Sequence, residues 1–96
     1  MYASVTVIEV RGAIDSLLDV IREALLPAAK AQEGFVGLEV LSNPGLGRLF
    51  LISRWQTERA LQAAEMQREY QQGFAQINSL LTIPPVEENY AVSLLV

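Results

Sequence analysis

Residues 47–61 read GRLFLISRWQTERAL, and the periodicity of this stretch changes halfway along it. Up to Trp55 the side chains alternate at a period of two, which is typical of a β-strand. After Thr57, a residue type that often caps a helix N-terminus, the apolar positions recur at helical spacing. The stretch therefore predicts a strand over 48–55 that passes directly into a helix, with the only tryptophan of the chain at the junction.

The same periodicities predict the other elements. We expect strands over 4–10, 35–41 and 89–96, a helix over 13–31, and two consecutive helical runs between Thr57 and Leu81 with a pause at 65–67. Pro27 should kink the first helix, because its nitrogen cannot donate to Glu23, and Gly34 can provide the left-handed cap. The Asn43-Pro44-Gly45 sequence predicts the hairpin turn, and Gly73 indicates a bend or a close approach within a helix.

The element order is β-α-β-β-α-β, which predicts a single domain over residues 1–96 with an α+β, ferredoxin-like fold. Four antiparallel strands would carry both helices on one face. The strands are nevertheless apolar on both faces, since Leu49 and Leu51 alternate with Phe50 and Ile52. An antiparallel sheet with one solvated face should alternate between apolar and polar side chains. We therefore expect a homodimer in which a second copy covers the free sheet face.

Composition excludes several classes of function. The net charge of −4 offers no basic surface for nucleic acid, and the absence of cysteine and histidine removes thiolate chemistry and the usual metal ligands. We expect no metal site. Apolar runs stay shorter than the ~18 residues of a membrane span, and the N-terminus has no basic region followed by an apolar stretch, so we expect a cytoplasmic protein without membrane contact.

Several segments resemble one known family when they are taken together. They are LLPAAKAQ at 25–32, EGFVGLEVL at 33–41, RW followed by Thr-Glu-x-Ala-Leu at 54–61, and EYQQGFAQI at 69–77. In this order and at these separations they resemble the antibiotic biosynthesis monooxygenase (ABM) family of dimeric α+β barrels over nearly the whole chain. The resemblance implies a homodimer with two sheets packed face to face, and a pocket between sheet and helices in each subunit.

The resemblance also implies candidate activities. One group of such proteins consists of oxygenases that need no cofactor and act on anthrones or quinols, whose deprotonated forms reduce oxygen directly. A second group degrades haem with a tryptophan and a histidine at places that correspond here to Ala64 and Phe74. Neither residue can take that role, and the chain has no histidine. The resemblance therefore favours chemistry without a cofactor.

Four residues are candidates for substrate binding: Trp55, Tyr70, Phe74 and Asn78. Trp55 is either a pocket wall or a core aromatic, and Tyr70 and Phe74, one turn apart, either line a pocket for a flat aromatic molecule or cover the sheet. Asn78 either binds a substrate oxygen or is a solvated or capping side chain near the helix end. Arg54 should point to the opposite face from Trp55 and pair with Glu39 or Glu9.

Proton chemistry would need a carboxylate with a raised pKa or a tyrosine with a lowered one, and the sequence identifies neither. Among the polar groups considered, Tyr2, Glu9 and Tyr90 receive no catalytic assignment. Glu65 belongs to a polar set that we interpret as a solvated helix face, with Gln62, Gln67, Arg68, Gln71 and Gln72.

Two hypotheses follow. The chain is a monooxygenase that oxidises a small aromatic phenol, quinol or anthrone with molecular oxygen, or it is a non-catalytic dimeric barrel that binds a small apolar ligand or serves in assembly.

Overall fold

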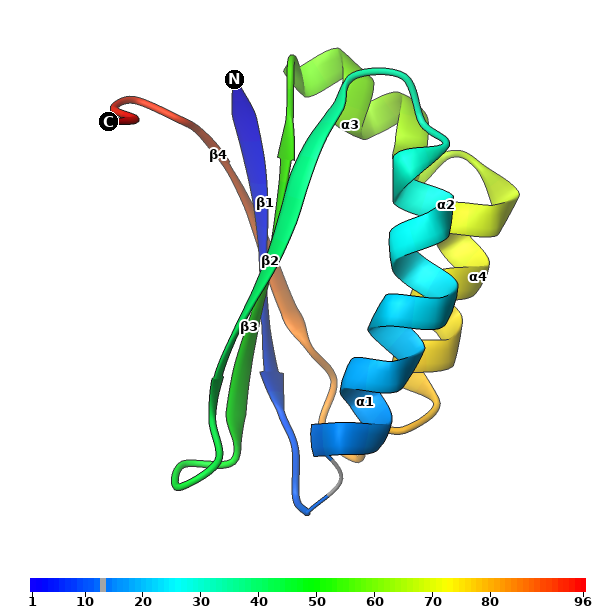
Figure 1. Cartoon of the computed structure of the whole chain (residues 1–96), viewed down its shortest axis with the longest axis vertical. Helices are drawn as coiled ribbons and strands as arrows, with labels where there is room; N and C mark the ends of the chain where they lie inside the picture. Colours follow the sequence, from blue (N-terminus) through cyan, green and yellow to red (C-terminus); the bar gives the residue numbers. More distant parts are fainter. Residues whose placement is uncertain (13) are drawn as a thin grey trace.

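The computed structural model describes residues 1–12 and 14–96 and contains one twisted sheet with helices on one face (Figure 1). The elements in chain order are β1 Tyr2–Glu9, α1 Ile14–Val20, the π-helix η1 Ile21–Leu25, α2 Leu26–Lys30, β2 Phe35–Asn43, β3 Arg48–Trp55, α3 Glu58–Glu65, α4 Arg68–Asn78 and β4 Val86–Ala91. The strand order is β2-β3-β1-β4, and each neighbouring pair is antiparallel. The predicted α+β, ferredoxin-like fold is confirmed.

The first helical segment contains the predicted irregularity at Pro27, in a form that the sequence did not specify. Ahead of the proline the backbone widens into η1, where the Leu26 N–H donates to the Ile21 carbonyl five residues back. Because proline lacks an N–H, the usual bond to Glu23 is missing, and the wider turn lies directly before that gap. The start that we predicted at Ala13 lies outside the described residues.

The junction after Trp55 follows the prediction closely. β3 ends at Trp55, and the Thr57 hydroxyl accepts a hydrogen bond from the Ala60 N–H at 3.1 Å, which caps α3. Gly73 lies inside the continuous helix α4, where an added Cβ would come within 3.0 Å of the Leu25 Cα. The close approach of α4 to η1 therefore explains this glycine, and a bend is not required.

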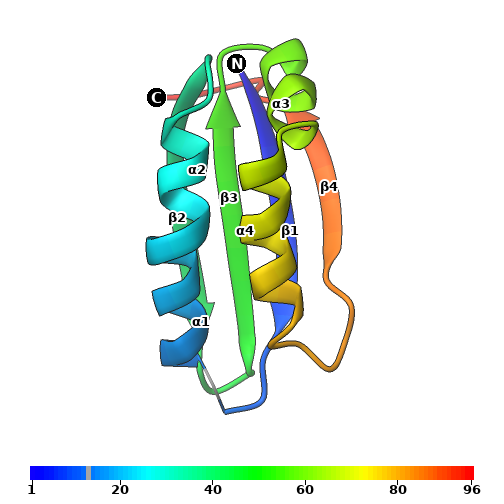
Figure 2. The ribbon, with the colours of Figure 1, turned by 90° about the vertical axis from the view of Figure 1, so that its right-hand side faces the viewer.

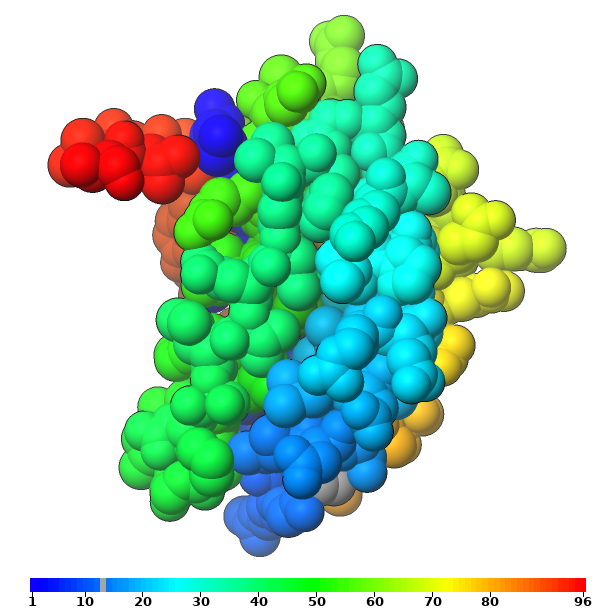
Figure 3. Space-filling model, viewed as in Figure 1, coloured from blue at the N-terminus to red at the C-terminus, as the bar shows by residue number. Residues whose placement is uncertain are grey.

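The last strand differs from its prediction. We expected it over 89–96, but β4 begins at Val86 opposite Val7 and ends at Ala91 opposite Tyr2. The ladder stops where β1 begins, at the N-terminus of the chain, so the residues after Val92 have no strand to pair with. They project from the body as an extended tail, with Leu94 82% exposed (Figure 3).

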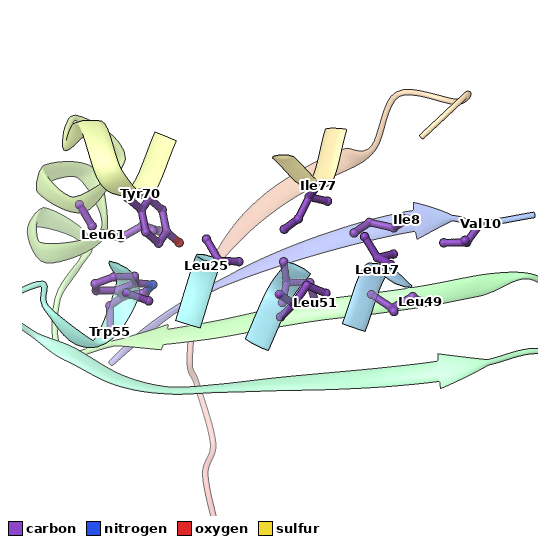
Figure 4. Packing of buried hydrophobic residues seen from close by; sticks show 13 residues of the cluster. Ile8, Val10, Leu17, Leu25, Leu49, Leu51, Trp55, Leu61, Tyr70 and Ile77 are labelled. Carbon is purple, nitrogen blue, oxygen red and sulfur yellow. The ribbon is translucent and has the colours of Figure 1, made fainter. Parts of the chain in front are cut away.

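The helices cover most of one face of the sheet but leave β4 without a helix in front of it (Figure 2). Between the two layers lies the core, in which Leu17, Leu49 and Ile8 lie toward one end and Trp55, Tyr70 and Leu61 toward the other (Figure 4). Burying these side chains is the main source of stability, at about 25 cal/mol per Å². Within the described residues, none of the helices has the length and apolar character needed to cross a membrane.

The other sheet face carries no helix. Alternation and register give it a set of apolar side chains: Val5, Val7, Leu41, Phe50, Ile52 and Val86. Leu41 and Val86 are 51% and 58% exposed. The prediction that both sheet faces are apolar is confirmed for these strands.

Candidate functional site

Four aromatic side chains form a row at one end of the core. Phe35, Trp55, Tyr70 and Phe74 contact one another in sequence, with edge-to-face ring centroids 5.3, 5.8 and 5.2 Å apart. Edge-to-face packing places the positive edge of one ring on the negative face of the next, which fixes the orientation of each ring. The row therefore runs from the sheet through the core to the helix layer.

Trp55 occupies the buried middle of this row. Its side chain is wholly buried, and its indole N–H donates to the Ser53 hydroxyl at 3.0 Å. Ser53 precedes Trp55 by two residues and so points to the same face of β3. Of the two interpretations of Trp55, the structure favours the core aromatic: it packs behind Tyr70 and lines no wall of the pocket described below.

A pocket of about 280 Å³ lies beside β4. The helix layer leaves this strand largely uncovered (Figure 2). The walls of the pocket come from the end of α3, from one side of α4 and from β4. The lining residues are Glu65, Tyr70, Gln71, Phe74, Ala75, Asn78 and Glu87. The structure thus brings together Tyr70, Phe74 and Asn78 of the four predicted residues, with Asn78 exposed at the end of α4.

Tyr70 is 3% exposed and stays neutral at physiological pH. Burial raises the pKa of its hydroxyl to about 12, with smaller contributions from the negative charges of Glu87 and Glu65, while a hydrogen bond with Ser53 acts in the opposite direction. A tyrosine base would need a lowered pKa. Tyr70 can therefore offer a neutral hydroxyl to a ligand but is not a proton acceptor.

The Glu65 carboxyl group, unlike the Tyr70 hydroxyl, has a pKa close to neutral pH. Partial burial, a hydrogen bond with Glu87 and the negative charge of Glu87, in decreasing order of size, together raise the pKa of its carboxyl from 4.5 to about 7. Two carboxyl groups that share a site cannot both ionise easily, because like charges repel. The interpretation of Glu65 as part of a solvated helix face is therefore wrong: it is half-buried and contacts Glu87.

Glu87 lies outside the strand predicted over 89–96, so the sequence did not identify it as a site residue. Starting β4 at Val86, directly after the two prolines, puts Glu87 on the same face as Thr6, its partner in the β1–β4 ladder. Alternation from that start would have assigned Glu87 to the helix side of the sheet. The proline pair was thus the signal that could have identified this residue.

Buried hydroxyl groups lie beside Glu87 on the helix-facing side of β1. The Ser4 hydroxyl donates to Glu87 Oε1 at 3.0 Å and fixes one oxygen of the carboxylate. Thr6 is 2% exposed, and its Oγ1 has no hydrogen-bond partner. A buried hydroxyl without a partner costs about 1–3 kcal/mol, and Thr6 is not among the residues that line the pocket.

The remaining polar candidates lie elsewhere. Arg54 points to the open sheet face, as predicted, and pairs with Glu39 at 2.6 Å rather than with Glu9. Tyr2, Glu9 and Tyr90 do not line the pocket. A larger surface hollow of about 530 Å³ lies between η1, α2 and α4, but it contains none of the predicted residues. Within residues 1–12 and 14–96, no three acidic side chains cluster as metal ligands.

Comparison with known proteins agrees with this architecture. The fold resembles SnoaB, a cofactor-independent oxygenase from Streptomyces nogalater, with a TM-score of 0.85 and 18% identity over 99% of this chain and 95% of that one. It also resembles Rv0793 from Mycobacterium tuberculosis, with a TM-score of 0.77 and 23% identity over 95% and 93% of the two chains. At these identities the likeness establishes the fold alone. No curated protein matches the sequence.

The family is established by the sequence itself. The model of the family described as "Antibiotic biosynthesis monooxygenase" matches residues 1–76. This span runs from β1 to within α4 and contains Trp55, Tyr70 and Phe74. The chain belongs to the antibiotic biosynthesis monooxygenase family.

Proposed function

We propose that the protein is a cofactor-independent monooxygenase that oxidises a small aromatic phenol, quinol or anthrone with molecular oxygen. The observation that carries this proposal is the pocket beside β4, where the rings of Tyr70 and Phe74 meet the carboxyl groups of Glu65 and Glu87. Pockets for small molecules are mainly apolar and aromatic, with a few convergent polar groups. Family membership and the oxygenase activity stated for SnoaB support the same assignment.

In this oxidation the main tasks of the protein are to bind the substrate and to transfer a proton. A deprotonated anthrone or quinol is electron-rich enough to reduce oxygen directly. When an anthrone methylene becomes a carbonyl, the substrate gives up four electrons, one oxygen atom enters the product, and the other leaves as water. The protein must hold the ring, favour its anion and keep bulk water away from the reacting carbon.

Individual residues have distinct roles in this proposal. Tyr70 and Phe74 hold the flat ring, and the Asn78 amide at the pocket rim orients a substrate oxygen. Trp55 does not contact the substrate. Its ring packs behind the Tyr70 ring, at a centroid distance of 5.8 Å, and positions it. The pocket of about 280 Å³ favours a small substrate, because drug-sized ligands occupy about 300–1,000 Å³.

Oxygen consumption tests the activity. Wild-type protein is incubated in air with a panel of quinols and anthrones, without flavin or metal, and compared with Asn78→Ala. Loss of one hydrogen bond, worth about 1 kcal/mol, should lower kcat/KM about fivefold. Gln72→Ala, an exposed change on another side of α4, is the matched control and should match wild type. Ring binding without any oxygen consumption would instead favour the non-catalytic ligand-binding barrel.

We also propose that the protein is a homodimer through the open sheet face. The exposed apolar side chains of that face are the first support, because a solvated antiparallel face is normally polar. The Arg54–Glu39 pair, whose side chains are 36% and 42% exposed, would be largely shielded from water there. The apolar C-terminal tail projects on the same side of the sheet, away from the helices (Figure 1).

A further inference from the structure

We propose that Glu65 is the group that accepts the proton of the substrate hydroxyl, and that Glu87 sets the pH at which it can do so. This inference rests on the proposed oxidation of a phenol-type substrate. Glu65 ends α3, Glu87 lies on β4, and the two carboxyl groups meet at the pocket that Tyr70 and Phe74 wall. Among the residues that the structure describes, no other carboxyl group lines this pocket.

The surroundings of Glu65 are acidic rather than basic. The titratable side chain that raises the pKa of Glu65 is Glu87, and the charge of Glu65 in turn raises the pKa of Tyr70 on α4. Neither Glu65 nor Glu87 forms an ion pair within the part of the chain that the structure describes. A carboxylate held by Arg or Lys would be a weaker base, because the cation stabilises its charged form. The absence of such a partner leaves the Glu65 carboxylate comparatively basic.

The pKa values make the proton transfer feasible. An ordinary phenol has a pKa of about 10, and an ordinary glutamate about 4.3, so the transfer would be strongly uphill. With the pKa of Glu65 near 7, the gap between the pKa of the phenol and that of Glu65 falls to about three pKa units. About half of the Glu65 carboxyl groups are then ionised at neutral pH. A general base is most effective when its pKa lies near the working pH.

The step is a simple proton transfer. The substrate O–H bond breaks, a bond forms between the proton and a Glu65 carboxylate oxygen, and the electron pair stays on the substrate oxygen. The resulting anion is the species that reduces molecular oxygen. The Ser4 hydroxyl, which donates to Glu87 Oε1 at 3.0 Å, holds the Glu87 carboxyl group in place beside Glu65.

The first experiment titrates Glu65 directly and does not require activity. Carbon-13 NMR of the labelled glutamate carboxyl groups should find one midpoint near pH 7, which disappears in Glu65→Gln. In Glu87→Gln the Glu65 midpoint should move down toward 4.5, because the charge of Glu87 is removed. A Glu65 midpoint that stays in place in Glu87→Gln would overturn the role given to Glu87.

The second experiment measures the affinity for a hydroxyanthraquinone, a probe whose phenolic hydroxyl can donate to the Glu65 carboxylate. Binding to wild type should tighten as pH rises through about 7, where Glu65 ionises, and Glu65→Gln should lack this pH dependence. Glu69→Gln on the exposed side of α4 is the matched control and should behave as wild type. The same pH dependence of binding in wild type and Glu65→Gln would overturn the inference.

Turnover separates this inference from the proposed function. With an active substrate, Glu65→Gln should lower kcat/KM about 100-fold or more, and Glu87→Gln should shift the rising limb of the pH profile to lower pH. Wild-type turnover that Glu65→Gln leaves unchanged would overturn the inference but not the function. No turnover by wild type with any member of the panel would overturn the function, and the bound probe would then decide the role of Glu65 alone. Circular dichroism checks that each variant is folded.

Discussion

Trp55 is the residue whose position the sequence predicted and whose role, pocket wall or core aromatic, the sequence left open. The change of periodicity located it at the end of a strand, and the structure confirms that location. Its side chain is wholly buried and is held by the Ser53 hydroxyl. Alternation along a strand tells which face a side chain is on, but it does not tell whether that face is filled or hollow at that point.

Trp55→Ala should destabilise the fold by about 3–5 kcal/mol, because it leaves a large cavity between Phe35 and Tyr70. Urea unfolding followed by far-UV circular dichroism measures this, since the variant lacks tryptophan fluorescence. Met66→Ala is the control: Met66 is 77% exposed, and the change should stay within about 0.5 kcal/mol. A small effect of Trp55→Ala would mean that its site is not a packed core.

The raised pKa of Glu65 predicts how the stability of the fold changes with pH, independently of any activity. Its folded pKa of about 7 lies above the ordinary 4.5, so the folded chain binds this proton more tightly than the unfolded one. The resulting stabilisation is full below pH 4.5 and is lost as pH rises through about 7. Glu65→Gln removes this dependence, so the stability of the variant relative to wild type should be higher at about pH 8 than at about pH 5.

Urea midpoints at the two pH values measure the effect. The matched control is Glu69→Gln, whose stability relative to wild type should change much less between them. If Glu65→Gln showed the same relative stability at both pH values, Glu65 would titrate as an ordinary exposed glutamate.

At the scale of the elements, local sequence signals located most boundaries. Thr57 caps α3 as predicted, because a threonine hydroxyl can satisfy a free N–H of the first turn without help from the rest of the fold. The form of the irregularity before Pro27 was not predictable in the same way. The missing hydrogen bond is encoded locally, but packing of the helix against α4 and the sheet decides how the backbone compensates.

Gly34 joins the first helical segment to β2 with a φ of +84°, and an added Cβ would lie 2.5 Å from the Ala60 Cβ. Gly34→Ala should therefore cost at least about 1–2 kcal/mol from the left-handed conformation, and more from the clash with α3. Gly37→Ala is the control, since its φ is not positive and no atom lies within 4 Å of its added Cβ. Denaturant midpoints of the two variants test this, and equal values would contradict it.

At the scale of the whole molecule, the apolar side chains on the open sheet face predict a homodimer. Wild type should have about twice the monomer mass of 10.6 kDa in light scattering. Ile52→Glu, which introduces a charge on that face, should shift the protein to monomers, because burying an unpaired charge costs several kcal/mol. Arg59→Glu, on the exposed side of α3, is a charge-changing control that should remain dimeric. A wild-type mass of a monomer at micromolar concentration would refute the homodimer.

The candidate site was only partly predictable. Tyr70 and Phe74 share one face of α4 because they are one helical turn apart, and that spacing is written in the sequence. Glu65 and Glu87 are 22 positions apart and meet only because β4 returns along β1 to the uncovered edge of the sheet. A raised carboxyl pKa depends on burial and on the neighbouring charge, and both belong to the tertiary structure.

The sequence by itself determined the order of the elements, the cap at Thr57, the left-handed turn at Gly34 and the apolar character of both sheet faces. Each of these follows from local periodicity or from the conformational preference of one residue. Only the tertiary structure decided that Trp55 is core, that β4 begins at Val86, and that Glu65 and Glu87 share a pocket. These features depend on which segments distant in the chain pack together, and local sequence does not carry that information.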